Sequence, residues 1–284
     1  MPPLRWGVLS VMFALATFAP TPVDPFALYE YAPSGASGIV FPGYSTTTGR
    51  TAVSAELADG ETTGIFLVVG QSLLANHNGS LHSPSSTKVQ NLNPYNGTVY
   101  QMKDEVLGAS GSSNGSILPY LGDKLITAGT FDRVIFIPVA IGGSAMRDWE
   151  PSGMLFHRLV VALLRAREKG YAISGVIFEL GQSDQMLGTS QAAWQSSFQR
   201  MLDGARGYGF NGPWFVAQCS MLSNVTSSTV RAAQAAVVDN VNVFAGPDID
   251  TLTSSTNRSD GTHLTATGAN GSAALWETVL SSHF

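Results

Sequence analysis

IFLVV, at residues 65–69, is an uninterrupted apolar run that ends directly at Gly70-Gln71-Ser72. Comparable runs follow along the chain at Val134–Ala140, Val176–Leu180, Trp214–Gln218 and Val241–Ala245. Apolar runs of this length are typical of strands that are buried on both faces, as in a parallel sheet. The sequence therefore predicts five buried parallel strands.

Stretches with helical spacing of apolar residues lie between and after these runs, at residues 118–128, 155–169, 192–205, 230–238 and 265–280. Repeated alternation of strand and helix predicts a doubly wound α/β fold with a five-stranded parallel sheet. In such a fold the functional residues gather at the carboxyl ends of the strands. The polar residues that follow each apolar run are therefore the candidates for a site.

Composition limits the function classes. The chain has 284 residues, 44% of them hydrophobic and 12% charged, so it can bury a sizeable core. A formal net charge of -5 argues against a nucleic-acid partner, because such proteins need a basic surface. The single cysteine, Cys219, excludes an intramolecular disulfide and a thiolate zinc cluster. No apolar stretch reaches the length of a membrane-spanning helix.

The N-terminal part differs from the rest. Residues 1–20 carry one arginine and then a short apolar stretch, which predicts a signal peptide and a secreted or periplasmic protein. An apolar arm packed on the domain is the alternative interpretation. Residues 21–63, rich in Pro, Gly, Ser and Thr, predict an irregular lead-in segment, and residues 64–284 predict one domain.

Polar sequences follow three of the strands. Ser72 is expected at a strand-to-helix turn, either as a nucleophile at the positive end of the next helix or as a cap of that helix. Gly142 and Gly143 are expected to turn the backbone so that an N–H points into the cleft, as an oxyanion hole requires, or to form an ordinary tight turn. Gln182 offers a side-chain amide to the same oxyanion. Asp184 is expected to brace that loop or to cap a helix.

A fourth sequence, Asp260-Gly261-Thr262-His263, precedes the last helix. An aspartate three residues before a histidine can accept a hydrogen bond from one ring nitrogen, which leaves the other nitrogen to act as a general base on a serine. His263 is the one histidine with a carboxylate at this spacing, and His77 is expected only as a wall of the cleft. Trp149, Trp194 and Trp214 fit either sugar stacking or core packing.

These four blocks, in this order, resemble the SGNH/GDSL hydrolase superfamily. More narrowly, they are similar to the sialate O-acetylesterase and acetylxylan esterase group, carbohydrate esterase family six. The resemblance implies a three-layer α/β/α flavodoxin-like sandwich over residues 64–284. It also implies catalysis by Ser72, His263 and Asp260 without a cofactor or metal, and an oxyanion hole at Ser72 and Gly142 or Gly143.

Two positions depart from the family pattern. Leu73 stands where relatives commonly have Asn, and Leu180-Gly181-Gln182 stands where they commonly have Gln-Gly-Glu. Whether Gln182 supplies the missing amide donor is left open by the sequence. We predict a serine esterase that removes O-acetyl groups from carbohydrate. The alternatives are a general short-chain ester or lipid hydrolase of the superfamily, and a catalytically inactive carbohydrate-binding relative.

Overall fold

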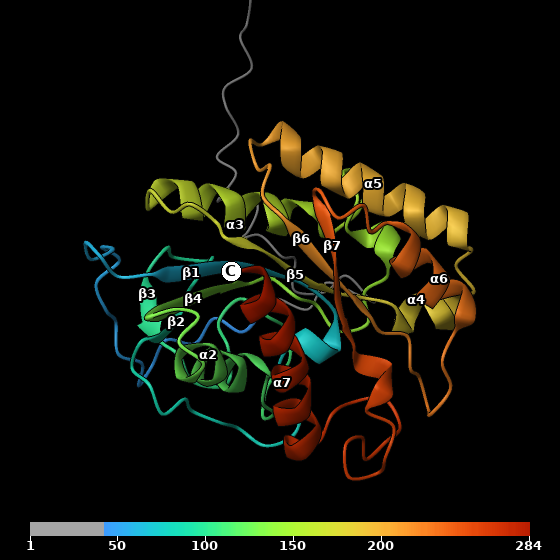
Figure 1. The fold of residues 1–284 in the computed structure, drawn as a ribbon, viewed down its shortest axis with the longest axis horizontal. Coiled ribbons are helices and arrows are strands. Elements are labelled where there is room, and N and C mark those ends of the chain that lie inside the picture. The colour runs from blue at the N-terminus through green and yellow to red at the C-terminus, as the bar shows by residue number, and fades with distance from the viewer. Residues whose placement is uncertain (1–42) are drawn as a thin grey trace, which may run out of the picture.

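The computed structural model describes residues 43–284, which form a seven-stranded sheet between two layers of helices (Figure 1). The strand order is β3-β2-β4-β1-β5-β6-β7. All neighbouring strands run parallel except β3, which pairs with β2 in the antiparallel sense. The strands are β1 Thr63–Gly70, β2 Val89–Leu92, β3 Val99–Gln101, β4 Arg133–Pro138, β5 Gly175–Glu179, β6 Trp214–Gln218 and β7 Val243–Asp248.

The predicted fold class is confirmed, but the predicted count of five strands is wrong. β2 and β3 were missed because β2 buries polar residues and so lacks an apolar run. The Asn91 side chain accepts from the Leu107 N–H at 2.7 Å, and the Gln90 side chain accepts from the Arg133 guanidinium at 2.6 Å. Hydrogen bonds of this kind make buried polar side chains tolerable within a strand.

The five predicted strands lie in the spatial order β4-β1-β5-β6-β7, which is the flavodoxin-like order 2-1-3-4-5. In that order β1 lies between β4 and β5. The chain passes from β1 to β4 on one side of it and then crosses to β5, β6 and β7 on the other side. A crevice therefore opens at the carboxyl ends of β1 and β5. Ser72 and Gln182 follow these two strands.

Helices cover both faces of the sheet. α3, α5 and α6 pack on one face, while α2 and α7 pack on the other. The short α4, which the sequence did not predict, begins directly after β5. The helices are α2 Leu118–Thr127, α3 Phe156–Glu168, α4 Gln182–Leu187, α5 Gln191–Gly207, α6 Ser228–Ala236 and α7 Ala266–His283, with single 3-10 turns η1 Ser72–Leu74, η2 Met146–Asp148 and η3 Ile249–Thr251.

The three candidate tryptophans belong to the core. Trp149, Trp194 and Trp214 are at most 1% exposed, and all three pack in the cluster between the sheet and α3 and α5. Trp149 also donates from its indole N–H to the Ser144 hydroxyl. The packing interpretation therefore holds, and sugar stacking on these rings is excluded.

The predicted signal peptide at residues 1–20 lies outside the described residues, as does most of the lead-in segment. Within residues 43–284, no helix is long and apolar enough to cross a membrane. The same residues contain no cluster of three His, Cys, Asp or Glu side chains that fits a metal ion. Domain boundaries and export remain predictions.

Candidate active site

Ser72 lies at the carboxyl end of β1, where the chain leaves the sheet. Gly70 has a φ of +155°, and a Cβ there would lie 2.2 Å from the Glu179 carbonyl oxygen of β5. Glycine is therefore needed to bring the turn against β5. Ser72 itself is 5% exposed and begins η1.

The regular helix expected after Ser72 is absent, because η1 has only three residues. The chain turns instead into a loop that two buried asparagines hold. Asn76 accepts from the Val106 N–H at 2.7 Å, and Asn78 donates to the Leu73 carbonyl at 2.7 Å. Ser72 is thus positioned by side chains of the following loop rather than by a helix.

His263 and Asp260 are paired on the loop before α7. The His263 Nδ1 lies 2.8 Å from one carboxylate oxygen of Asp260, and the other oxygen accepts from the backbone N–H groups of Thr262 and His263. Burial raises the pKa of Asp260, but these hydrogen bonds outweigh burial and hold it below its usual range. The carboxylate therefore stays ionised, and its position fixes the ring with Nε2 as the free nitrogen.

Ser72 and His263 line one cavity of about 400 Å³, which we call the Ser72 cavity. Asn78 links the two loops that carry these residues. Its side-chain oxygen accepts from the Leu264 N–H at 3.2 Å, while its amide donates to the Leu73 carbonyl. The other lining residues are Gln71, His77, Gly142, Gly143, Gln182, Ser183, Met186, Leu222 and Thr262.

The two glycines after β4 differ in their hydrogen bonds. The Gly142 N–H donates to the Ser110 hydroxyl at 2.7 Å. Gly143 has a φ of +75°, a conformation that favours glycine, and its N–H has no hydrogen-bond partner within residues 43–284. A free backbone donor is thus present at Gly143.

Gln182 is buried at the start of α4, and neither polar atom of its amide has a partner among the described residues. An unpaired buried amide costs about 1–3 kcal/mol. Asp184, on the same short helix, accepts from the Met146 N–H at 3.0 Å and so braces the loop after β4. Burial raises the pKa of Asp184 to about 6.

His77 is a wall of the cavity, as the sequence predicted. Its ring lies 6.1 Å from the His263 ring, centroid to centroid, and its Nε2 lies 3.1 Å from the Ser110 hydroxyl. Burial, and then the charge of His263, lowers the pKa of His77, which favours the neutral ring. Sequence reasoning missed Ser110 and Asn78, because isolated polar residues in loops give no periodic signal.

A family model for carbohydrate esterases, described as sialic acid-specific acetylesterase, matches residues 62–274 of the chain. The chain belongs to this family. It is thus a carbohydrate esterase, as the four sequence blocks indicated. No curated protein matches it at a significant level.

Solved structures share the fold of this esterase at low sequence identity. A protein from Arabidopsis thaliana is 16% identical with a TM-score of 0.63, and the match covers 79% of this chain and 99% of that one. A carbohydrate acetylesterase from Xanthomonas citri is 11% identical with a TM-score of 0.51, and the match covers 78% of this chain and 56% of that one. Both similarities support the α/β fold.

Proposed function

We propose that this esterase removes O-acetyl groups from carbohydrate, with Ser72 as nucleophile, His263 as general base and Asp260 as the carboxylate that orients the base. One observation carries the proposal. His263 is held by Asp260 at 2.8 Å through Nδ1, and the same ring lines the cavity that contains Ser72. This is the arrangement of base and orienting acid that activates a serine hydroxyl.

The reaction then has two steps. His263 Nε2 takes the proton of the Ser72 hydroxyl as Oγ attacks the ester carbonyl, and the same proton passes to the sugar oxygen when its bond to the acyl carbon breaks. Water, activated by His263, then attacks the acetyl-enzyme, and acetate leaves with regeneration of the Ser72 hydroxyl.

Three donors suit the oxyanion of the tetrahedral intermediates. The N–H groups of Ser72 and Gly143 have no partner within the described residues, and the buried Gln182 amide is unpaired as well. We assign the oxyanion hole to these groups, because free donors aimed at developing charge stabilise it without reorganisation. The Gly142 N–H is engaged by Ser110, so Gly142 stays a weaker candidate than its neighbour.

A general short-chain esterase is the second candidate. Met186 is 67% exposed and lines the Ser72 cavity together with Leu222, so an acyl chain longer than acetyl would meet apolar side chains there. A series of p-nitrophenyl esters from acetate to octanoate separates the two candidates. Carbohydrate deacetylation predicts that the rate falls as the acyl chain lengthens.

The direct test is Ser72→Ala, assayed by acetate release from acetylated xylan. Loss of the nucleophile should reduce kcat by about 10⁴-fold or more, while the free energy of unfolding changes little. Tyr208→Ala, far from the cavity, is the matched control and should keep the wild-type rate. Wild-type activity in the Ser72 variant would refute the mechanism.

A further inference from the structure

A second cavity, of about 500 Å³, adjoins the Ser72 cavity, and the two share His77 and His263 as lining residues. We call it the polar cavity. It lies beside the loop of Asp260 and the beginning of α7. Its other lining residues are Gly79, Ser80, Asn114, Ser259, Asp260, Leu264, Thr265 and Ala266.

The two cavities differ in the chemistry of their walls. Met186 and Leu222 give the Ser72 cavity an apolar side, whereas hydroxyl and amide groups predominate in the polar cavity. The side chains of Ser80, Asn114 and Ser259 are exposed, and none has a hydrogen bond within residues 43–284. These groups are therefore free to bind a ligand that is rich in hydroxyl groups.

The charge of the lining residues further limits the class of ligand. No lysine or arginine lines either cavity in the described part of the chain, and Asp260 adds a negative charge to the polar cavity. Recognition of a carboxylate or phosphate normally relies on arginine or lysine. The walls thus favour an uncharged sugar over sialic acid, which carries a carboxylate.

The proposed reaction fixes which part of the ester lies where. His263 must deliver its proton to the oxygen of the leaving alcohol, so that alcohol lies beside the imidazole, with the acyl group nearer to Ser72 and the oxyanion donors. The imidazole borders both cavities. We propose that the polar cavity binds the leaving alcohol as a neutral sugar ring, with Ser80 and Asn114 as specificity-determining hydrogen-bonding residues. This rests on the proposed function.

The test compares two substrates in the Ser80→Ala/Asn114→Ala variant: acetylated xylo-oligosaccharides, and p-nitrophenyl acetate, whose leaving group has no sugar hydroxyls. Loss of two hydrogen-bonding groups should lower kcat/KM for the oligosaccharides by about tenfold, mainly through KM. The rate with p-nitrophenyl acetate should stay within about twofold of wild type. The control is Ser282→Ala/Asn240→Gly, two exposed positions at the far end of the sheet, which should change neither rate.

A third substrate, O-acetylated sialic acid, tests the charge argument. Wild-type enzyme should deacetylate it with a lower kcat/KM than the neutral oligosaccharides. A preference for sialic acid, equal losses on both substrates in the double variant, or no loss on either would overturn the assignment of the polar cavity. Activity retained in Ser72→Ala would instead refute the proposed function, so the two failures are distinguishable.

Discussion

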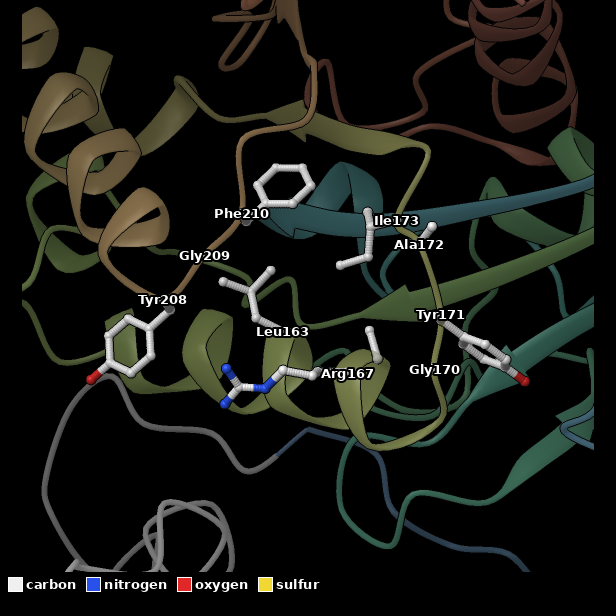
Figure 2. A pocket seen from close by; sticks show the side chains of 10 residues that line it. Leu163, Arg167, Gly170, Tyr171, Ala172, Ile173, Tyr208, Gly209 and Phe210 are labelled. Atoms are coloured by element: carbon white, nitrogen blue, oxygen red, sulfur yellow. The ribbon is translucent and has the colours of Figure 1, made fainter.

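Two hollows of similar size lie at different places in the molecule. The Ser72 cavity is about 400 Å³ and opens at the carboxyl ends of β1 and β5, whereas a groove of about 410 Å³ lies beside the ends of α3 and α5, between Leu163, Tyr208 and Phe210 (Figure 2). Apart from the exposed Arg167, the groove has aromatic and aliphatic walls, and it contains no serine, histidine or carboxylate.

The difference between them lies at the ends of the central strands, where polar groups of the Ser72 cavity lack partners. The Ser72 cavity holds the unpaired amide of Gln182, the free N–H of Gly143 and an oriented histidine. A buried amide without a partner, such as that of Gln182, costs stability unless a ligand or transition state uses it. Size therefore does not identify a site in this fold, whereas unpaired polar groups at the ends of the central strands do.

Asp260→Asn should have the largest effect among the variants that test this contrast. Asparagine keeps an oxygen for the Thr262 and His263 N–H groups, but its amide NH₂ faces His263 Nδ1 and favours the tautomer that protonates Nε2. We expect kcat to fall by about 10²–10⁴-fold. Acetate release measures it.

Asp239 provides the matched control for this variant. It lies in the loop before β7, at the opposite end of the sheet from the Ser72 cavity. Its carboxylate accepts hydrogen bonds from the backbone N–H groups of Val241, Asn242 and Val243. Asp239→Asn should leave kcat unchanged. Equal losses in the two variants would mean that Asp260 acts only as a loop brace.

Gln182→Met should change activity and stability in opposite directions. Methionine fills a similar volume without polar atoms, so the penalty for a buried, unpaired amide disappears and the free energy of unfolding should rise by about 1 kcal/mol. Without the amide donor, kcat should fall by about 10²–10³-fold. Thermal unfolding tests the expected rise in stability, and kcat measured on the same preparation tests the expected loss of activity. Unchanged kcat would remove Gln182 from the oxyanion hole.

Asn78→Ala should have a smaller effect on the rate, because Asn78 only positions the reacting groups. Its loss frees the Leu73 carbonyl and the Leu264 N–H, so Ser72 and His263 lose a shared tether. We expect kcat to fall by about 10-fold to 100-fold. Asn91→Ala is the control, because Asn91, in β2, is equally buried and also holds a loop through two hydrogen bonds to the backbone, both to Leu107. It should lose similar stability and keep kcat per folded molecule.

The sequence predicted the parts of the site that rest on strand ends and short-range spacing. The five predicted strands, the five main helices, and the pairing of Asp260 with His263 three residues later all follow local patterns. It failed where distant groups decide the local structure. β2 is a strand because Arg133 and the Leu107 N–H satisfy its polar side chains.

The turn after Ser72 was mispredicted for the same reason. A helix was expected there, but Asn76 and Asn78 bond to backbone groups 30 and 186 residues away and bend the chain into a loop. Partners so far along the sequence leave no periodic pattern that can be read from the chain. The sequence offered Gly143 and Gln182 as oxyanion donors, but it could not show that they are unpaired, because the absence of a partner is a property of the folded chain.

The smallest effect is expected in stability, at Glu179 under the turn that leads to Ser72. Glu179 ends β5 and is fully buried, with one oxygen accepting from the Trp276 indole N–H at 3.1 Å. Burial raises its pKa from 4.5 to about 7. Between these two pH values the folded state therefore binds a proton that the unfolded state has released, so raising the pH lowers the free energy of unfolding.

Glu179→Gln removes this titration and keeps an oxygen for Trp276. Asp104, whose pKa burial raises to about 7, and Asp184 act in the same direction, so the variant should show a shallower loss of stability from pH 5 to 8 rather than none. Urea unfolding at several pH values across this range measures the loss of stability. The groove in Figure 2 contains no acidic residue, so Tyr208→Ala should keep the wild-type slope. An unchanged slope in Glu179→Gln would mean that the carboxyl group does not hold its proton in the folded protein.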